Sequence, residues 1–399
     1  MSEIVITGIG AISAIGNSTE EMFTSLKEGR HGIRPISVLN TSLAGSYLAG
    51  EIKLSNDELS KKTSLTGIQS RTTLLAATAI AEAIRSAQLS SDNLSKTGII
   101  SSTTVGGMDQ TEEHYYDFIN ANNIDFAKVH PSGEHTNKLA SLFGLSNHIS
   151  TISTACSSAS NALIIGARLL KAKQIDRLIV GGADALAKFT LNGFKSLMIL
   201  DPNHCKPFDN KRKGLNLGEA AGYLVIETLE SAQKRGATIL AKLVAYANVN
   251  EAYHQTASSP NGDGAYAAMS KTLSMANLNN HDVDYINAHG TGTDNNDSSE
   301  STAINRLFAD TKVKFSSTKA FTGHTLAAAG GIEAVISILC LNNDFIPANL
   351  NFKNKIEGAQ LTPITENQTM NSSFKYILSN SFGFGGNNTT LLFSKNEIA

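Results

Sequence analysis

Short β-rich runs alternate with amphipathic helical patterns along the whole of this 399-residue chain. Strands interleaved with helices form sheets whose faces the helices cover, so the alternation predicts an α/β fold. The range Arg71–Gln88 shows the helical pattern clearly, with apolar side chains every three or four residues, and Ser157–Lys173 and Leu326–Leu341 also read as helices. The predicted strands are Ile4–Thr7, Thr97–Ser101, His148–Thr154, Leu178–Gly182, Gly222–Glu227, Ile239–Asn250, Val283–Ala288, Lys314–Thr318, Tyr376–Ser381 and Thr389–Phe393.

The chain also reads as two similar halves. Each half opens with an apolar strand, at Ile4 and at Ile239, and closes with a pair of strands. No Pro/Ser-rich linker or block of charge separates them, so two intimately packed halves fit better than two tethered domains. We predict a junction near Lys234–Thr238, which gives an N-terminal half of residues 1–236 and a C-terminal half of residues 237–399.

Composition limits the classes of function. Hydrophobic residues make up 41% of the chain and only 7 residues are Pro, which excludes a disordered or low-complexity protein. The net charge of −2 provides no global basic field that would attract nucleic acid or an anionic membrane. The start of the chain reads as a strand rather than a signal peptide, and the longest apolar run, Ile332–Leu341, is short and carries Glu333. We predict a soluble, cytoplasmic protein without membrane insertion.

The position of one cysteine favours nucleophilic chemistry. Cys156, Cys205 and Cys340 lie far apart without a C-x-x-C pair, so neither a disulfide framework nor a zinc ribbon is predicted. Cys156 follows a β-branched run that ends at Thr154 and precedes a helical pattern. The macrodipole and free N–H groups at a helix N-terminus lower the pKa of a thiol, so we expect an acidified, nucleophilic Cys156. A buried structural cysteine is the alternative interpretation.

Two histidines occupy comparable positions. His289 follows the predicted strand at 283–288 within the sequence NAHGTGT, and His324 lies in KAFTGH after the predicted strand at 314–318. Loops at the carboxyl ends of strands are where α/β sheets place their ligands. Each histidine alone reads as a polar loop residue, but together with Cys156 they predict one catalytic site, because a cysteine nucleophile needs a partner.

Four motifs in this order resemble the condensing enzymes, and more narrowly the elongating (type I/II) β-ketoacyl-[acyl carrier protein] synthases. They are TACSS from Thr154, NAHGTGT from Asn287, KAFTGH from Lys319 and NSFGFGGN from Asn380. The resemblance covers nearly the whole chain, since the opening VITGIGAISAIG and the central KPFDNKR also match. It implies the thiolase fold, in which two β/α halves form a five-layered αβαβα sandwich, and a homodimer.

The resemblance also implies a reaction. Cys156 would take an acyl group from a phosphopantetheine thioester, and malonyl carrier protein would then lose CO2 to give the enolate that attacks this acyl group. His289 and His324 would donate hydrogen bonds to the malonyl thioester oxygen, and the N–H groups of Cys156 and Phe384 would form the other oxyanion hole. The result would be an acyltransferase, a 3-oxoacyl-[acyl carrier protein] synthase that needs no metal and no bound cofactor.

Further residues receive supporting roles by the same resemblance. Lys319 would order the site through Glu333, a charge within an apolar helical run that pairing with a buried cation would explain. The remaining implied roles are binding of the pantetheine arm by Thr291 and Thr293, gating of the acyl pocket by Phe382 and Phe384, and support of the loop after His289 by Asp297 and Glu300.

The implied partner is an acyl carrier protein. Carrier proteins are acidic, so Lys61, Lys62, Arg71 and the run at 211–213 are candidate contacts, with a solvated charge cluster as the alternative.

Some residues depart from the common pattern of these synthases. Lys213 reverses an expected charge, Leu215 replaces an aromatic residue, and the segment between Phe194 and Lys206 is short. The product would belong to fatty acid synthesis or to a specialised polyene or polyketide pathway, and these departures favour a specialised product, such as a polyene or an aromatic lipid, over bulk fatty acids. A non-catalytic or heterodimer-dependent subunit resembling a chain-length factor is the alternative, although such subunits lose the nucleophile and Cys156 is intact.

Overall fold

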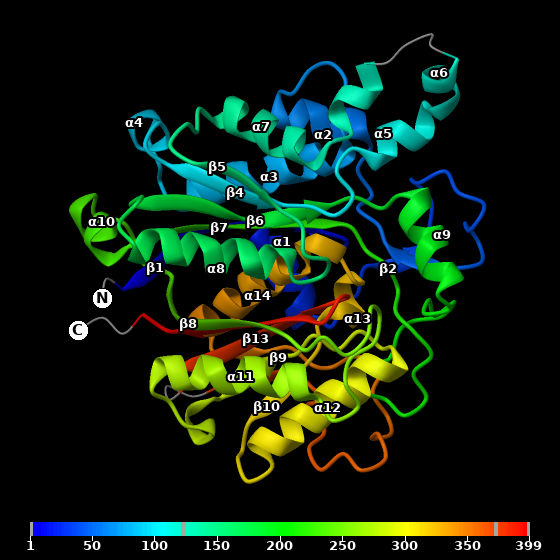
Figure 1. Cartoon of the computed structure of the whole chain (residues 1–399), viewed down its shortest axis with the longest axis vertical. Coiled ribbons are helices and arrows are strands. Elements are labelled where there is room, and N and C mark those ends of the chain that lie inside the picture. The colour runs from blue at the N-terminus through cyan, green and yellow to red at the C-terminus, as the bar shows by residue number, and fades with distance from the viewer. Residues whose placement is uncertain (1–2, 121–124, 371–373, 397–399) are drawn as a thin grey trace.

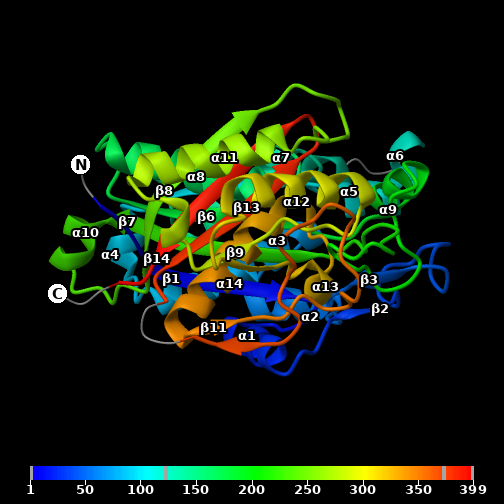
Figure 2. The same ribbon diagram turned by 90° about the horizontal axis from the view of Figure 1, so that it is seen from below.

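The structure is a computed structural model that describes residues 3–120, 125–370 and 374–396. Within these ranges, ten strands form one sheet in the order β10-β9-β13-β14-β8-β1-β7-β6-β4-β5 (Figures 1 and 2). Two short pairs lie outside it, β2 (Ile33–Pro35) with β3 (Leu48–Gly50) and β11 (Phe345–Ile346) with β12 (Gln368–Thr369). The strands of the sheet are β1 (Ile4–Ser13), β4 (Gly98–Ser102), β5 (Ile149–Ile152), β6 (Arg177–Asp184), β7 (Ala220–Thr228), β8 (Ala241–Asn250), β9 (Tyr285–Asn287), β10 (Lys314–Ser316), β13 (Tyr376–Gly383) and β14 (Asn387–Ser394).

Helices connect most of these strands. The α-helices are α1 (Thr19–Lys27), α2 (Asn56–Thr63), α3 (Arg71–Ser86), α4 (Ser91–Leu94), α5 (Met108–Glu113), α6 (Tyr115–Ile119), α7 (Ser132–Phe143), α8 (Ser158–Lys171), α9 (Lys188–Ser196), α10 (Leu229–Lys234), α11 (Asp263–Ala276), α12 (Asp294–Phe308), α13 (Lys319–Thr322) and α14 (Ala329–Asn343). Short 3₁₀ helices are η1 (Asp125–Val129), η2 (Asn280–Asp282) and η3 (Leu326–Ala328).

The sheet consists of two equivalent five-stranded halves. The order β1-β7-β6-β4-β5 in the first half corresponds to β8-β14-β13-β9-β10 in the second. In both halves the first three strands pair antiparallel and the last three pair parallel. The halves join where β1 pairs with β8 at Val5↔Lys242 and Ile6↔Ala241. The duplication expected from the sequence is therefore confirmed.

The elements stack in five layers. Helices α3 and α7 cover the outer face of the first half, and α11 and α12 cover the outer face of the second (Figure 1). Helices α8 and α14 pack against each other between the two halves. One apolar cluster lies beneath the outer helices of each half, and a third surrounds α8 and α14 and contacts strands of both halves, because a sheet flanked by helices must hide both faces. The αβαβα architecture predicted above is confirmed.

The strand β1 extends further than predicted. It pairs with β7 from Ile4 to Ser13, whereas the predicted strand ended at Thr7. A Cβ atom at Gly8 or Gly10 would collide with backbone atoms of α3. The glycines therefore allow a helix to approach the strand closely rather than ending it.

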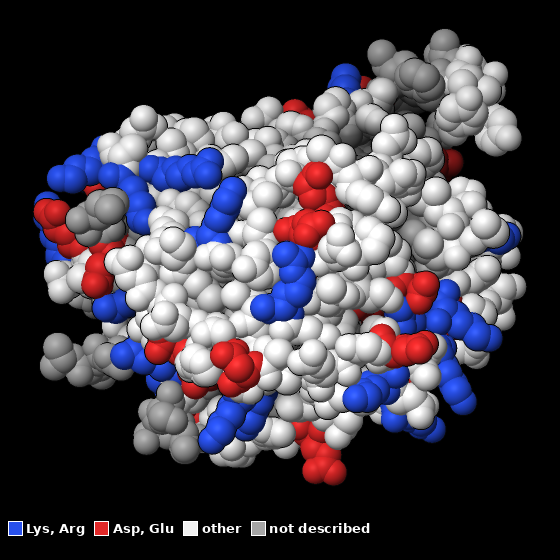
Figure 3. All heavy atoms as spheres, turned by 60° about the horizontal axis from the view of Figure 1, so that its bottom comes forward, with Lys and Arg blue, Asp and Glu red and all other residues white. Residues whose placement is uncertain are grey.

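The most apolar helical segment lies in the core. Leu326–Asn343, formed by η3 and α14, is long and apolar enough to cross a membrane, but 83% of it is buried inside the molecule. A helix that is hydrophobic all round is expected when both of its sides face protein. The surface carries interspersed charges instead, and Figure 3 shows basic and acidic side chains separated by uncharged areas over one face.

Candidate active site

Cys156 lies on a strained turn between β5 and α8. Ala155 has φ of 51°, a left-handed conformation that is uncommon for a residue with a side chain. The Ser158 hydroxyl holds this turn, since it accepts from Thr154 N–H at 2.8 Å and donates to Ala155 C=O at 2.6 Å. The turn directs Cys156 into a cavity of about 330 Å³ while leaving the residue only 6% exposed. Strained backbone of this kind is typical of functional sites.

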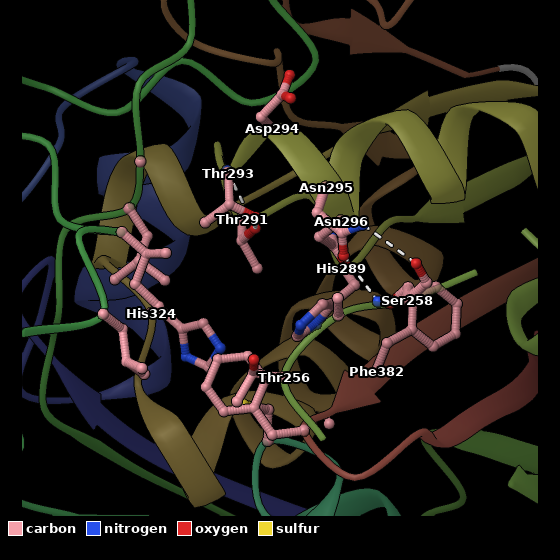
Figure 4. A pocket seen from close by; sticks show the side chains of 18 of the residues that line it. Thr256, Ser258, His289, Thr291, Thr293, Asp294, Asn295, Asn296, His324 and Phe382 are labelled. Carbon is pink, nitrogen blue, oxygen red and sulfur yellow. Dashed lines mark hydrogen bonds between the residues drawn. The ribbon is translucent and has the colours of Figure 1, made fainter. Parts of the chain in front are cut away.

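The two histidines lie beside this thiol. His289 follows β9 and His324 follows α13, so both come from the second half of the chain. Their ring centroids are 5.4 Å apart with perpendicular planes, and Figure 4 shows both imidazoles in the cavity. The Cys156 sulfur and one ring nitrogen of each histidine all lie within 4.8 Å of one another. The structure therefore brings together three residues that are at least 35 positions apart in the sequence.

Hydrogen bonds determine which nitrogen of each imidazole carries the proton. His324 Nδ1 accepts from Leu326 N–H at 3.0 Å, and His289 Nδ1 lies 3.2 Å from the Lys319 ammonium, which can only donate. Burial, followed by the charge of Lys319, lowers the pKa of His324 to about 3 and that of His289 well below its usual value. Both rings are therefore neutral near pH 7 and present Nε2–H donors to the cavity.

A buried ion pair lies behind His289. The Lys319 ammonium contacts the Glu333 carboxylate, and both side chains are at most 3% exposed. Burial raises the pKa of Glu333 to about 7, against the opposing effect of Lys319. The second Glu333 oxygen is 3.5 Å from the Ser381 hydroxyl on β13. The pairing expected for Glu333 is present, and it fixes the ammonium against the histidine.

Burial sets the acidity of the nucleophile candidate. Desolvation raises the pKa of Cys156 to about 11, although the Lys319 charge and the backbone N–H groups of Phe384 and Cys156 act in the opposite direction. Burial of the sulfur thus acts against the acidified thiol expected from the sequence. The sequence shows the helix that follows Cys156 but not the apolar packing that removes water from the sulfur.

The raised pKa has a measurable consequence. We expect alkylation of the substrate-free protein at Cys156 by iodoacetamide to accelerate about tenfold per pH unit between pH 7 and 9, because only the thiolate reacts. Peptide mass spectrometry would follow the rate at Cys156. The buried Cys205 and Cys340 provide an internal control for background labelling. A rate that levels off below pH 8 would show that the N–H groups and Lys319 outweigh desolvation.

Two buried carboxylates hold the loop that carries His289. Glu300 on α12 accepts from the N–H groups of His289 and Gly290 at 2.9 and 2.8 Å. Asp297 on the same helix accepts from Thr291 N–H at 2.9 Å. Helix α12 therefore fixes the loop through main-chain bonds. Thr291 and Thr293 line the cavity from this loop, with their hydroxyl oxygens 2.8 Å apart.

Two phenylalanines lie where β13 leads into β14, with Phe382 in the last part of β13 and Phe384 in the turn that follows it. Phe382 is buried and its ring centroid is 5.7 Å from that of His289. Phe384 is 36% exposed and stacks on Phe194 of α9 at 6.0 Å. Gly385, with φ of 83°, completes the turn and donates its N–H to Gln255 C=O at 2.7 Å. This hydrogen bond ties the turn to the loop that follows β8.

Two family models match this chain. The β-ketoacyl synthase N-terminal domain matches residues 1–232 and the β-ketoacyl synthase C-terminal domain matches residues 240–353. The chain belongs to the β-ketoacyl synthase family. The resemblance and the thiolase fold predicted from the motifs are thereby confirmed.

Individual synthases match over their full lengths. The 3-oxoacyl-[acyl-carrier-protein] synthase 2 of Staphylococcus aureus (strain N315) is 34% identical over 99% of this chain and 98% of its own. Among solved structures, the ishigamide ketosynthase/chain length factor has a TM-score of 0.92 and 28% identity, covering 99% of this chain and 100% of the other. The Xenorhabdus doucetiae ketosynthase ApeO, in complex with its chain length factor ApeC, has a TM-score of 0.84 and 30% identity over 99% and 98% of the two chains.

A hydrogen-bond network of asparagine side chains next to Cys156 of this synthase was not predicted from the sequence. Asn387 Oδ1 accepts from Ser157 Oγ at 2.8 Å, from Asn161 Nδ2 at 3.0 Å and from Asn248 Nδ2 at 2.9 Å. The network joins α8 of the first half to β8 and β14 of the second. Asn387 ends the NSFGFGGN motif, so its position in that motif was the available signal.

A second residue missed from the sequence supports the loop after His324. The buried Asp184, at the end of β6, accepts from Ala327 N–H at 2.8 Å and from Val105 N–H at 3.1 Å. The predicted strand ended at Gly182, which left Asp184 outside any element. A carboxylate two residues after the predicted end of the strand was the signal that could have revealed it.

The thiol and the two imidazoles of the candidate site are side chains of the kinds that bind zinc. Cys156, His289 and His324 offer one sulfur and two nitrogens at short separation. Both imidazoles, however, use Nδ1 as a hydrogen-bond acceptor and hold a proton on Nε2. A metal would require the Nε2 lone pairs, so this arrangement suits hydrogen-bond donation better than coordination.

Not every candidate contact for an acidic partner is available. Arg71 is only 6% exposed and forms a bidentate ion pair with Glu219 at 2.9 and 2.7 Å. Arg212 is also buried and pairs with Asp294. The expectation that these two arginines face a partner is therefore wrong, because carboxylates of the chain itself already occupy them. Lys61 and Lys62 on α2, together with Lys211 and Lys213, are exposed.

Proposed function

We propose that this chain is the catalytic subunit of a 3-oxoacyl-[acyl carrier protein] synthase, an acyltransferase that forms a carbon–carbon bond by decarboxylative condensation. The substrates are an acyl group held on Cys156 and malonyl carrier protein. The observation that carries the proposal is the placement of one thiol and two neutral Nε2–H imidazoles within 4.8 Å in one cavity. The intact Cys156 favours a catalytic subunit over the non-catalytic alternative.

The first stage loads the enzyme. Cys156 sulfur attacks the carbonyl carbon of an acyl-pantetheine thioester, the carbon–sulfur bond to pantetheine breaks, and the pantetheine thiol leaves with the proton lost by Cys156. The N–H groups of Cys156 and Phe384, which face the Cys156 sulfur, stabilise the oxyanion formed during this exchange. The sulfur needs no lasting charge, because its proton ends on the departing thiol.

The second stage forms the new bond. The bond between the malonyl carboxylate and its α-carbon breaks, CO2 leaves, and the electron pair remains as an enolate. The Nε2–H groups of His289 and His324 donate to the enolate oxygen, where negative charge develops. The α-carbon then attacks the acyl carbonyl, the bond to Cys156 sulfur breaks, and the thiolate takes up a proton. Neutral imidazoles can perform this task because each ring already carries its proton on Nε2, which faces the cavity.

The contacts of the residues around the site indicate their supporting roles. Lys319, fixed by Glu333, holds the His289 proton on Nε2. Asp297 and Glu300 hold the loop from which Thr291 and Thr293 contact the pantetheine arm. Phe382 and Phe384 form the gate of the acyl pocket, and the exposed Phe384 is the mobile member. Residues 1–236 carry the nucleophile and residues 237–399 carry the two histidines, so the chemistry needs both halves.

The partner is an acyl carrier protein, named in the designation of the S. aureus relative. We propose a soluble cytoplasmic homodimer as the working assembly. The solved relatives that comprise a ketosynthase and a chain length factor indicate the competing assembly, a heterodimer with a second subunit. Condensation by the chain purified alone would support the homodimer. Activity only after addition of a second ketosynthase-like chain would assign the heterodimer.

Intact-protein mass spectrometry tests the proposed function. We expect exposure to a panel of acyl carrier proteins to add one acyl mass to the wild-type chain and none to Cys156→Ser. The preferred acyl chain would distinguish fatty acid synthesis from a polyene or polyketide pathway. Absence of acylation from every carrier protein, together with no release of CO2 from malonyl carrier protein, would reject the proposal.

A further inference from the structure

Three asparagine side chains from three different elements meet beside Cys156. Asn387 Oδ1, at the start of β14, accepts from Asn161 Nδ2 of α8 at 3.0 Å and from Asn248 Nδ2 of β8 at 2.9 Å. Asn248 Nδ2 also donates to Asn161 Oδ1 at 2.6 Å, which closes the cluster. We call these three residues the asparagine clamp. The clamp joins the two halves of the chain at the point where the nucleophile lies.

The asparagine clamp contacts the turn that carries the nucleophile. We call residues 154–157 the nucleophile turn. The Ser157 hydroxyl lies 2.8 Å from Asn387 Oδ1 and 2.7 Å from Thr154 C=O. Asn161 Nδ2 donates to Thr154 Oγ1 at 2.9 Å. Both ends of the nucleophile turn are therefore bonded to the clamp.

Asn387 is also attached to the turn that carries Phe384. It pairs with Gly383 at the end of the β13–β14 ladder, and Phe384 directly follows that last pair. We call residues 383–386 the gate turn. A Cβ atom at Gly383 would lie 3.3 Å from Cys156 N, so the gate turn packs closely on the backbone of the nucleophile turn.

Among the residues that the structure describes, no main-chain hydrogen bond joins the nucleophile turn to residues 383–387. A second side-chain bond between the same elements, from Ser160 Oγ to Ser381 Oγ at 2.9 Å, lies farther along α8 and β13. The spacing between the two turns therefore depends on their packing and on the single oxygen of Asn387 that contacts the nucleophile turn.

The asparagine clamp replaces apolar packing in the core. Asn161 is 6% exposed, whereas the buried residues that follow it on α8, Ala162, Leu163 and Ile164, are apolar. A buried amide costs free energy unless its donors and its acceptor are paired, and a fully paired network fixes one geometry more strictly than apolar contacts do. The clamp is thus suited to hold two segments at a defined distance.

We propose that Asn387, through the asparagine clamp, is a positioning residue that aligns the N–H groups of Cys156 and Phe384 for acyl transfer. The inference rests on the proposed function and deepens it by naming a residue that does not line the cavity. The two N–H groups come from different halves of the chain, and oxyanion donors are effective only when they are aligned before the charge develops. Asn387 contacts both turns, so it sets the distance between the donors.

The test is Asn387→Leu, which keeps a similar side-chain volume and removes the accepting oxygen. We expect the rate of acylation at saturating acyl carrier protein to fall about 10- to 100-fold, because misaligned donors lose part of the roughly 10²- to 10³-fold that one oxyanion donor supplies. The KM should stay within about twofold of the wild-type value, because Asn387 does not line the cavity. Rapid quenching followed by intact-protein mass spectrometry would measure the acylation rate.

Decarboxylation provides the readout that separates positioning from general structural support. We expect CO2 release from malonyl carrier protein, compared between Cys156→Ala and the double variant with Asn387→Leu, to change by less than about twofold. The donors for this stage are His289 and His324, which follow β9 and α13 and lie outside the clamp.

The protein should still fold without the accepting oxygen. In Asn387→Leu, Asn161 Nδ2 retains Thr154 Oγ1 as a partner and Asn248 Nδ2 retains Asn161 Oδ1. Circular dichroism melting would check this. If Asn387→Leu does not fold, Asn248→Leu removes one donor of the clamp instead and should lower acylation in the same way by a smaller factor.

Thr272→Val is the matched control. It removes a buried hydroxyl on α11 that lies 3.3 Å from Thr390 C=O of β14, so it weakens the packing of the same strand outside the clamp. Both the acylation rate and CO2 release should remain at the wild-type level in this variant.

The remaining outcomes would overturn the inference. Unchanged acylation in Asn387→Leu would show that the clamp does not align the donors. An equal loss of acylation and CO2 release would make the clamp a general structural support. A rise in KM with an unchanged rate at saturation would assign Asn387 to substrate binding. Failure of the wild-type chain to acylate would instead reject the proposed function itself.

Discussion

Replacement of Cys156 by glutamine is expected to abolish condensation and to increase decarboxylation of malonyl carrier protein. Without a sulfur nucleophile no acyl enzyme forms, so we expect condensation to fall by at least about 10⁴-fold. The glutamine amide can place its oxygen near the N–H groups of residue 156 and Phe384, where the carbonyl of an acylated Cys156 would lie. The site would then resemble its loaded state, and malonyl carrier protein would lose CO2 without an acyl group to attack.

Release of labelled CO2 and mass spectrometry of the carrier protein would measure the two activities separately. The expected product of Cys156→Gln is acetyl carrier protein, formed when the enolate takes up a proton. Cys156→Ala is the matched control, since it lacks both the nucleophile and the amide and should lose condensation without a rise in CO2 release. Equal release from both variants would show that an empty site, rather than a mimic of the acyl enzyme, causes the increase.

The alternation of strands and helices was sufficient to predict the main elements of the fold. The ten strands of the sheet all overlap predicted runs, and α3 begins at the predicted Arg71. The short pairs β2–β3 and β11–β12 were missed, because runs of two or three residues carry no periodicity. The extension of β1 was missed because Gly8 and Gly10 mark a close helix contact, which depends on tertiary packing.

The motifs identified the residues that meet at the candidate site but not their chemical state. Cys156, His289 and His324 stood out because each follows a predicted strand. The acidity of Cys156 could not be predicted, since it depends on how completely other segments exclude water from the sulfur. The proton positions on the imidazoles could not be predicted either, because they depend on Leu326 and Lys319 as hydrogen-bond partners.

The protons on Nε2 of His289 and His324 are the basis of the second prediction, a loss of decarboxylation when either histidine is replaced. Substitution of His289 or His324 by alanine is expected to lower CO2 release by about 10²- to 10³-fold, the usual consequence of removing one oxyanion donor. Because the pKa of His324 is lowered to about 3, its ring stays neutral above that value, and no titration of this group should appear in the wild-type rate between pH 5 and 8. Single-turnover CO2 release across this pH range would check both expectations.

The same variants separate the two stages of the reaction. His324→Ala should still form the acyl enzyme, because the N–H groups that face Cys156 sulfur belong to the main chain of residues 156 and 384. His324→Asn retains an N–H donor and should recover part of the decarboxylation lost in His324→Ala. Undiminished CO2 release from both alanine variants would remove the histidines from the enolate site. If His324→Ala lost both acylation and decarboxylation, His324 would instead be a partner of the Cys156 thiol, because its removal would impair the first stage as well.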